Sequence, residues 1–389
     1  METKRNFIWQ IIPIMLAFFA MGFVDLTGIA TNYVKKDFAL SDSVANLFTS
    51  VVFFWFLVFS VPTGMLMNKI GRRKTVIISL LISLLGLALP IVDYTLPIML
   101  LSFCLLGIGN TVMQVSLNPL LSNIVDSRRL SSALTLGQFI KAVAAFSAPL
   151  IAGWAALHFG NWRLLLPIFM VEGIVAALLL WGEKIKEEEL TGRASTFREC
   201  FALLGDTTVL ICFLGIICHV GIDVGTNVSA PRLLMEKLHL SLDVTAKATS
   251  IYFLFRTFGS LLGAFALAKY STRGFFAVSV TALAVAMVAL MFAYNQSTLY
   301  ILLAIIGLGN ANIFPVLFSE AILHRPDKKN EISGLMIMGI FGGTIFPPLM
   351  GLASDIFNSQ NGAILIMTAG VAYLLLIIGK IKNHDKKPA

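Results

Sequence analysis

The amino-acid sequence predicts an all-α membrane protein whose twelve transmembrane helices form two pseudo-symmetric bundles of six. Two observations lead to this fold class. Of the 389 residues, 57% are hydrophobic and only 13% are charged, whereas charged residues approach a quarter of a typical soluble domain. In addition, apolar segments long enough to cross a bilayer recur along the whole chain, and short motifs repeat between its two halves.

Charged breaks separate twelve apolar segments, each of which is predicted to cross the membrane as a helix. The segments are residues 7–34, 44–68, 74–92, 96–124, 130–157, 161–181, 207–233, 246–270, 274–294, 298–323, 331–357 and 361–380. The first segment has no small-residue cleavage site after it, so we expect a retained span and not a signal peptide.

The distribution of lysine and arginine predicts how these spans are oriented. Basic residues gather in alternate loops, such as Lys69–Lys74 and Lys184–Arg198, and in both terminal tails. Because cytoplasmic loops are enriched in Lys and Arg, both termini are expected to be cytoplasmic. The net charge of +8 then reflects membrane topology and does not indicate a nucleic-acid partner.

An internal repeat divides the spans six plus six. The motif GIGN at residues 107–110 recurs as GLGN at 307–310, and Leu40-Ser41 recurs as Leu240-Ser241. The longest polar stretch, residues 182–206, is predicted to be a cytoplasmic linker between an N-terminal bundle (1–181) and a C-terminal bundle (207–389). A duplicated unit of this kind implies a two-fold axis along the membrane normal and a substrate site between the halves.

Three amide side chains follow each other at four-residue spacing in the fourth span. Asn110, Gln114 and Asn118 therefore share one helical face. In hydrocarbon an unpaired amide costs several kcal/mol, so this face must meet other helices or a water-filled cavity. Two interpretations stay open: the stripe is part of a polar pathway, or it joins neighbouring helices.

Ionisable residues inside spans are costly and mark functional sites by default. They are Asp25, Lys141, Glu172, His219, Asp223 and Arg256. Proton coupling needs a carboxylate whose affinity for a proton changes during transport, and Asp25 and Asp223 are the candidates. Glu172 lies in the sixth span and is not one of these candidates.

The remaining polar residues of the spans are candidates for binding a substrate. The set comprises Asn110, Gln114, Asn118, Gln138, Lys141, His219, Asn227, Arg256, Asn310 and Asn312. A neutral sugar is suited by amides and by aromatic faces, which Phe139, Tyr252 and Phe255 could supply. The cations Lys141 and Arg256 suit a substrate carboxylate. Alternatively, either cation is the permanent partner of an aspartate.

Enzymatic chemistry is not indicated. No nucleophile and base, phosphate-binding loop or metal-ligand cluster occurs at a useful spacing. The four cysteines show neither CxxC nor metal spacing, so free thiols and no metal or other cofactor are expected.

The loop after the second span reads GMLMNKIGRRK, from Gly64 to Lys74. It resembles the signature loop of the major facilitator superfamily in position and in residues, which implies a cytoplasmic gating element. The gating residues would be Gly64, Asn68, Lys69, Gly71, Arg72 and Arg73. Asn68 stands where the family has aspartate, which implies a weaker charge interaction at that position.

Within that superfamily the chain resembles the fucose:proton symporter family of bacterial sugar transporters. The resemblance includes LNPLLSNIV in the fourth span, HVGIDVGTNVSAPRLL in the seventh, RTFGSLLGA in the eighth, and GLGNANIFPVLFS and GGTIFPPLMGLASD in the tenth and eleventh. The family has an acidic residue near Gly28 and a glutamate where this chain has Gln114. Because Gln114 cannot take up a proton, Asp25 or Asp223 would have to replace these groups.

The sequence thus predicts a secondary active transporter of a bacterial inner membrane, monomeric in the lipid bilayer. It would take up a monosaccharide or a sugar acid with a proton by alternating access. A proton-coupled exporter of drugs or metabolites and a transporter-like solute sensor are the alternatives.

Overall fold

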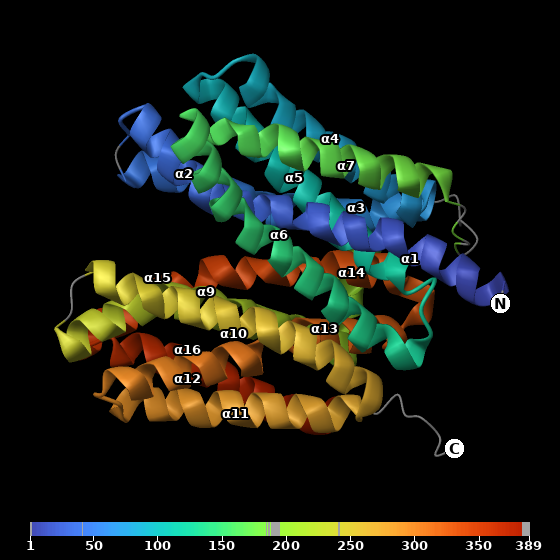
Figure 1. The fold of residues 1–389 in the computed structure, drawn as a ribbon. Coiled ribbons are helices and arrows are strands. Elements are labelled where there is room, and N and C mark those ends of the chain that lie inside the picture. The colour runs from blue at the N-terminus through green and yellow to red at the C-terminus, as the bar shows by residue number, and fades with distance from the viewer. Residues whose placement is uncertain are drawn as a thin grey trace. The chain divides into compact units, whose positions relative to one another are not determined.

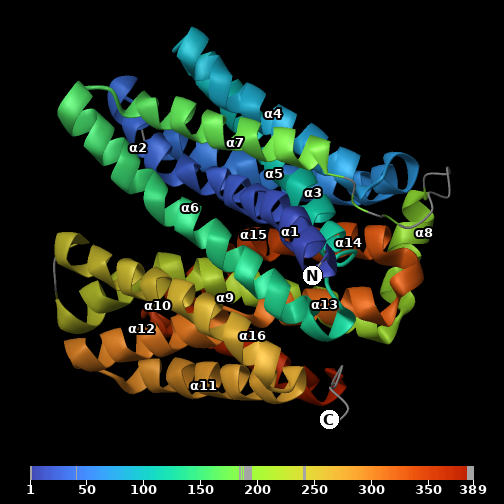
Figure 2. The same ribbon diagram turned by 45° about the vertical axis from the view of Figure 1, so that its right-hand side comes forward.

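The computed structural model describes residues 2–40, 42–183, 185, 187, 195–239 and 242–382 (Figures 1 and 2). The described residues form helices and no strand. Within them, eleven helical segments are long and apolar enough to cross a membrane, and a shorter apolar helix, Trp9–Val24, belongs to the first predicted span. The twelve predicted spans are therefore confirmed, with boundaries that differ by a few residues.

The helices of the first six spans are α1 (Glu2–Met21), α2 (Leu26–Asp37), α3 (Asp42–Ile70), α4 (Arg72–Val92), α5 (Leu96–Leu121), α6 (Leu130–Phe159) and α7 (Leu165–Gly182). A short helix, α8 (Phe197–Ala202), precedes the later spans. These are α9 (Thr207–Leu238), α10 (Leu242–Lys269), α11 (Thr272–Phe292), α12 (Gln296–Asn310), α13 (Ile313–His324), α14 (Lys329–Met338), α15 (Gly342–Phe357) and α16 (Asn361–Ile377).

Three of the spans are interrupted. The first span changes from α1 to the 3₁₀ turn η1 (Gly22–Asp25) and then to α2. The tenth span is interrupted after Asn310, and the eleventh at η6 (Gly339–Phe341). Irregular backbone at membrane depth is tolerated only where protein or a water-filled cavity surrounds it. Each interruption is therefore expected to face protein or a water-filled cavity and not lipid.

Residue contacts divide the chain into two compact units, which we call the N-unit and the C-unit. The N-unit contains Met1–Asp126, Ile140–Phe201 and Asp327–Met338, and the C-unit contains Ser127–Phe139, Ala202–Pro326 and Gly339–Ala389. The start of the fifth span thus belongs to the C-unit, whereas the start of the eleventh span belongs to the N-unit. The predicted division, with a linker at residues 182–206, assigns every span as a whole to one bundle. It therefore does not include this exchange.

The sequence repeat places equivalent glycines against equivalent neighbours in the two units. A Cβ atom on Gly107 would lie 2.8 Å from the carbonyl oxygen of Val52, and one on Gly307 would lie 2.6 Å from that of Tyr252. Likewise, Gly109 lies against Ser79 and Ser83, and Gly309 lies against Ser279 and Leu283. Because the paired neighbours are also 200 residues apart, the predicted duplication extends to the packing of the helices.

Large apolar side chains cover the outer faces of both units. In the N-unit, α4 and α7 lie side by side in both views and expose Leu81 and Leu178 (Figures 1 and 2). In the C-unit, α11 exposes Val278 and Val285. A surface of this kind suits a lipid environment, where apolar side chains need not be buried in protein.

Candidate functional site

Five side chains of the C-unit form one connected hydrogen-bond network. His219 Nδ1 lies 2.9 Å from Asn310 Oδ1, and Asn310 Nδ2 donates to the Tyr252 hydroxyl oxygen at 3.1 Å. The Tyr252 hydroxyl donates to Asp223 Oδ1, and Arg256 Nε lies 3.1 Å from the same oxygen. We call these residues the Asp223 network. It brings together four residues that the sequence nominated, from α9, α10 and α12.

Close packing of α10 on α12 positions Tyr252 and Arg256. A Cβ atom on Gly307 would lie 2.6 Å from the Tyr252 carbonyl oxygen and 3.0 Å from the Arg256 amide nitrogen. On the other helix, a Cβ atom on Gly259 would lie 2.9 Å from that of Ala311. Neither contact leaves room for a larger residue, so the RTFGSLLGA and GLGN segments are explained by close helix approach.

The interruption of the tenth span directs two asparagines toward α9 and α10. Asn310 is the last residue of α12, and the helix resumes only at Ile313. Asn312 Nδ2 donates to the Gly259 carbonyl oxygen at 2.9 Å. Pro315 lies in the first turn of α13, where its missing N–H is tolerated.

The Asp223 network has two partly exposed side chains and three buried ones. The side chain of Arg256 is 35% exposed and that of Asp223 is 16% exposed, whereas His219, Tyr252 and Asn310 are buried. The network therefore has an accessible end at the ion pair and a closed end at His219.

Three of the nominated amides keep a buried polar atom without a hydrogen-bond partner among the described residues. These atoms are Asn118 Oδ1, Gln138 Nε2 and Asn312 Oδ1. Most buried polar atoms in proteins are paired, and a ligand or water can provide the missing partner. The two carboxylate oxygens of Glu172, on α7, also lack a partner within this part of the chain.

The amide stripe of α5 is largely occupied by contacts inside the N-unit. Asn110 Nδ2 donates to the carbonyl oxygen of Met21, the last residue of α1. Gln114 Nε2 donates to Asn110 Oδ1 at 2.6 Å, and Asn118 Nδ2 donates to the Gln114 carbonyl oxygen at 2.8 Å. These contacts favour the helix-joining interpretation for Asn110, because it satisfies a backbone group at the interruption of the first span.

Lys141 is half-buried on α6. The helical turn that contains Lys141 packs against η1, where the first span is interrupted. A Cβ atom on Gly22 would lie 2.6 Å from the Lys141 carbonyl oxygen. Gly22 begins η1 and Asp25 ends it, and residues three apart share one face of a 3₁₀ helix. The side chain of Asp25 lies outside the described residues. Asn227 is half-buried on α9, one turn after Asp223.

The loop after the second span begins α4 with a glycine turn and a carboxylate. Gly71 adopts a positive φ of 89°, which favours glycine. The carboxylate of Glu187 accepts hydrogen bonds from the amides of Arg72 and Arg73, the latter at 3.1 Å. A carboxylate at this position satisfies free amides and complements the positive end of the helix dipole.

A glutamate on α14 contacts the loop at Asn68. Asn68 Nδ2 donates to Glu331 Oε1 at 2.8 Å and to Ser195 Oγ at 2.7 Å. The Ser195 hydroxyl donates to the same glutamate oxygen, and Lys328 Nζ lies 3.5 Å from it. The loop therefore contacts a carboxylate although residue 68 is an asparagine.

The other residues of the loop differ in their surroundings. Arg72 is buried and donates from Nε to Asn330 Oδ1 at 2.7 Å. Arg73 donates from Nε to the Leu180 carbonyl oxygen at 2.9 Å. Gly64 allows close approach, because a Cβ atom there would lie 2.6 Å from the Asn330 carbonyl oxygen. Lys69, in contrast, is exposed.

Comparison with known families decides the assignment. The sequence model of the family described as Major Facilitator Superfamily matches residues 14–225 and 211–389. The chain belongs to the Major Facilitator Superfamily. It is therefore a transporter and not an enzyme.

Relatives with assigned names align with this superfamily member over most of their length. A glucose/galactose transporter of Brucella abortus is 23% identical over 383 residues, which are 91% of this chain and 90% of the relative. A putative glucose/galactose transporter of Helicobacter pylori is 25% identical and covers 95% of both chains. A putative tartrate transporter of Agrobacterium vitis is 22% identical over 97% of this chain and 89% of its own.

Solved structures of the superfamily share the fold. The transporter FucP, crystallised in the outward conformation, superposes with a TM-score of 0.82 at 19% identity and covers 96% of this chain and 100% of its own. The proton:xylose symporter XylE superposes with a TM-score of 0.77 at 14% identity over 98% and 97% of the two chains. The predicted resemblance to the fucose:proton symporter family is thus confirmed at the level of the fold.

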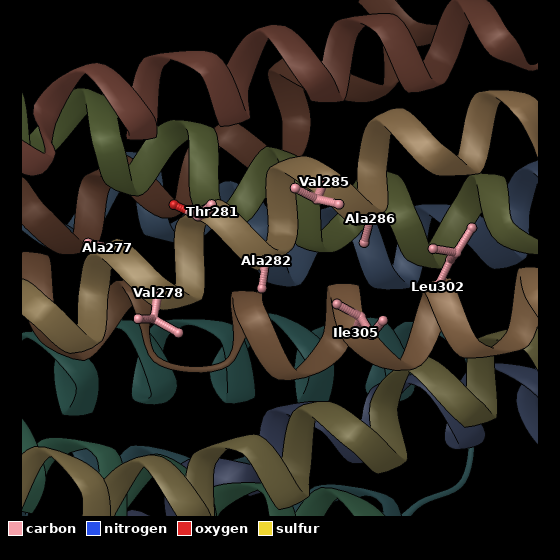
Figure 3. Close-up of a pocket in the computed structure, with 8 residues that line it drawn as sticks. All are labelled: Ala277, Val278, Thr281, Ala282, Val285, Ala286, Leu302 and Ile305. Carbon is pink, nitrogen blue, oxygen red and sulfur yellow. The ribbon is translucent and has the colours of Figure 1, made fainter.

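A groove of about 580 Å³ on the C-unit is not part of the candidate site (Figure 3). Side chains of α11 and α12 line it: Ala277, Val278, Thr281, Ala282, Val285, Ala286, Leu302 and Ile305. Since no ionisable side chain and only one hydroxyl line this groove, it is suited to apolar contacts and not to a polar solute.

Contacts at the ends of the spans fix the loops of this transporter. In the N-unit, Tyr94 donates to Asp37 Oδ2 at 2.7 Å, and burial together with Asp37 raises the pKa of Tyr94. In the C-unit, Asp206 accepts from the Thr208 amide at 2.9 Å and pairs with His324 Nε2 at 3.0 Å. Burial alone would raise the pKa of Asp206, but the hydrogen bonds from His324 and the amides lower it.

Sequence reasoning did not include Glu331, Ser195 and Glu187 among the site residues. Glu331 had a usable signal, since it is an acidic residue at the first turn of the eleventh span. Ser195 and Glu187 had none, because nothing in a polar linker distinguishes the residues that contact the loop.

Proposed function

We propose that this transporter imports a monosaccharide together with a proton by alternating access. The ion pair of Asp223 and Arg256 inside the seventh and eighth spans is the observation that supports it most. Such pairs in membrane interiors mark substrate and proton pathways. The relatives named glucose/galactose transporters support a sugar, and the symporters FucP and XylE support a proton.

Asp223 is proposed to take up the coupling proton. As a carboxylate it accepts from Arg256 and Tyr252 at one oxygen, Oδ1. A proton on Asp223 would remove the charge that attracts Arg256, so proton uptake would change what Arg256 contacts. Asp25 is the second candidate. It is the last residue of η1, and the first residue of η1, Gly22, packs against the backbone of Lys141.

The substrate is proposed to be a neutral monosaccharide. Sugar hydroxyls both donate and accept hydrogen bonds, and Gln138 Nε2 and Asn312 Oδ1 in the C-unit offer one donor and one acceptor without a protein partner in the described residues. Asn118 and Asn227 are the further candidates. Asn110 and Gln114 already bond inside the N-unit, so a supporting role is proposed for them.

A sugar acid is the alternative substrate, and the relative named putative tartrate transporter is the observation that favours it. It would need a cation for its carboxylate. The nominated cations are Lys141 and Arg256, and Arg256 pairs with Asp223. Lys141→Met should leave transport of neutral sugars intact if the substrate is neutral. If a carboxylate binds there, the variant should lose acidic-sugar binding by roughly 2 to 5 kcal/mol.

The loop after the second span is proposed to act as a gate. Support comes from the N-unit, where Asn68 and Arg72 hold Glu331 and Asn330 at the start of the eleventh span. The Ser333 hydroxyl also donates to the Val115 carbonyl oxygen of α5. Opening would require α14 to leave α3 and α5, and the interruption at η6 provides a place for the helix to bend.

The protein is proposed to reside as a monomer in a bacterial inner membrane with both termini in the cytoplasm. The distribution of Lys and Arg supports this orientation.

Competition for uptake tests the substrate. Purified transporter in proteoliposomes is given radiolabelled galactose, and unlabelled glucose, galactose, glucuronate and tartrate are added in turn. Competition by the two hexoses and none by the two acids is expected. Competition by the acids alone would contradict the neutral-sugar assignment, and the absence of any uptake would favour a sensor or an exporter.

A further inference from the structure

We propose that His219 is a positioning residue that aims the hydroxyl of Tyr252 at Asp223 through the side-chain amide of Asn310. This inference deepens the proposed proton coupling and depends on Asp223 being the coupling group. His219 itself does not touch Asp223 through a hydrogen bond in the described network. Its influence would pass through two intermediate side chains on two other helices.

The chemistry of the donors and acceptors fixes the direction of the network. The carbonyl oxygen of Asn310 can only accept, so the hydrogen between it and His219 belongs to Nδ1. The amide nitrogen of Asn310 can only donate, so the Tyr252 oxygen accepts from it. The single hydrogen of the Tyr252 hydroxyl is then free to point at Asp223. Every donor in the network is therefore oriented toward the carboxylate.

Such an arrangement stabilises the charged form of Asp223 relative to the protonated form, because donors strengthen when the acceptor is ionised. Without His219, the amide of Asn310 would be free to rotate and offer its oxygen to Tyr252. The Tyr252 hydroxyl would then donate to Asn310, and the charged form of Asp223 would lose one of the two donors that the described contacts give it.

Burial makes this orientation effective. His219, Asn310 and Tyr252 are 4%, 0% and 0% exposed, respectively, so water does not compete for their hydrogen bonds. In a setting of low dielectric constant, linked hydrogen bonds polarise one another. The buried residues His219, Asn310 and Tyr252 can therefore keep their hydrogen bonds in one fixed direction. The proton and the solute would arrive at the accessible end, at Asp223 and Arg256.

The charged and titratable groups that reach Asp223 are Arg256 and Tyr252 on α10 and His219 on α9 itself. Titratable groups on the other helices that pack on α9 have different partners. These are Tyr300 on α12 with Gln296, His324 on α13 with Asp206, Glu320 on α13 with the Lys382 amide, and Tyr373 on α16 with the Ile211 carbonyl oxygen. On α15, Asp355 lies in the last turn, next to the helix end at Phe357.

The test compares the pH profile of sugar uptake in the wild type and in four variants, of which Tyr252→Phe removes the hydroxyl that donates to Asp223. His219→Ala removes the orienting donor, and His219→Asn restores a donor near the position of Nδ1. Thr226→Val is the matched control, because Thr226 is buried on the same helix and donates to its own helix at Ile222, outside the network. Thermal unfolding of each purified variant shows whether it is folded.

His219→Ala is expected to move the pH of half-maximal uptake upward by at least half a unit, with an unchanged KM for the sugar. His219→Asn should return the midpoint toward that of the wild type, and Thr226→Val should leave it unchanged. Tyr252→Phe removes the hydroxyl that donates to Asp223. This variant should shift the midpoint in the same direction as His219→Ala.

An unchanged midpoint in His219→Ala, together with a shifted one in Tyr252→Phe, would overturn the role of His219. So would a failure of His219→Asn to restore the profile. If Asp223→Asn still accumulates sugar against a gradient, the coupling assignment itself is wrong, and this outcome is separate from the first two. A folded His219→Asn variant keeps the proposal testable even where His219→Ala does not fold.

Discussion

Arg256 Nε lies 3.1 Å from Asp223 Oδ1, and the two residues come from neighbouring spans of the C-unit. Removing one partner of such a pair leaves the other charge poorly solvated, whereas removing both does not. We expect Arg256→Gln to destabilise the protein by about 1 to 3 kcal/mol, less than for a fully buried pair because Arg256 is 35% exposed. The double variant with Asp223→Asn should recover part of this loss. Thermal unfolding in detergent measures both, and strictly additive losses would contradict the pairing.

The proposed gating loop contains a matched pair of basic residues. Arg72 is buried and bonded to Asn330, whereas Lys69 is exposed. We expect Arg72→Ala to lower the turnover rate several-fold with little change in KM for the sugar, because these contacts lie at helix ends. Lys69→Ala should change the rate much less. Initial uptake rates over a range of sugar concentrations separate the two parameters. A large increase in KM with a normal rate in Arg72→Ala would place this residue in the substrate site instead.

Gly71 and Gly182 provide a test of the turn that begins α4. Gly71 has a positive φ of 89°, and a Cβ atom there would lie 3.0 Å from a carboxylate oxygen of Glu187. Gly182, at the end of α7, has open space around its Cβ position. We expect Gly71→Ala to cost about 1 to 2 kcal/mol of stability and Gly182→Ala to cost close to nothing. Equal unfolding temperatures for the two variants would contradict the strained turn.

The lowered pKa of Asp206 predicts how the stability of the folded protein depends on pH. Its pKa in the folded protein lies below the ordinary value of 3.8, so the folded state is stabilised above that pH. This contribution is lost as the pH falls below 3.8 and through the lower pKa of the folded state. Asp206→Asn keeps an N-cap side chain but loses the charge. The variant should be less stable than the wild type by about 1 kcal/mol near neutral pH. The difference should shrink under acid conditions, and a difference that grows on acidification would contradict this account.

Sequence alone was sufficient for the fold because its signals are local or repeated. Apolar length predicted the spans, and the recurrence of GIGN as GLGN predicted a duplication that the contacts of Gly107 and Gly307 confirm. The ionisable residues His219, Asp223 and Arg256 were found because charge inside a span is rare.

Partners across helices were harder to predict. Nothing local indicates that Asn310 bonds His219, or that Asn68 donates a hydrogen bond to Glu331. The exchange of the starts of the fifth and eleventh spans between the two units was also not visible, because hydropathy reports only that a segment crosses the membrane.

Accumulation of sugar in proteoliposomes under an imposed pH gradient tests the central claim most directly. Wild-type protein should concentrate galactose or glucose while the gradient lasts and lose the accumulated sugar when an uncoupler is added. Asp223→Asn should fail to accumulate the sugar but still exchange labelled for unlabelled sugar across the membrane, because only the titrating group has been removed. Accumulation by Asp223→Asn at the wild-type level, or wild-type uptake that ignores the pH gradient, would contradict proton-coupled sugar transport through Asp223.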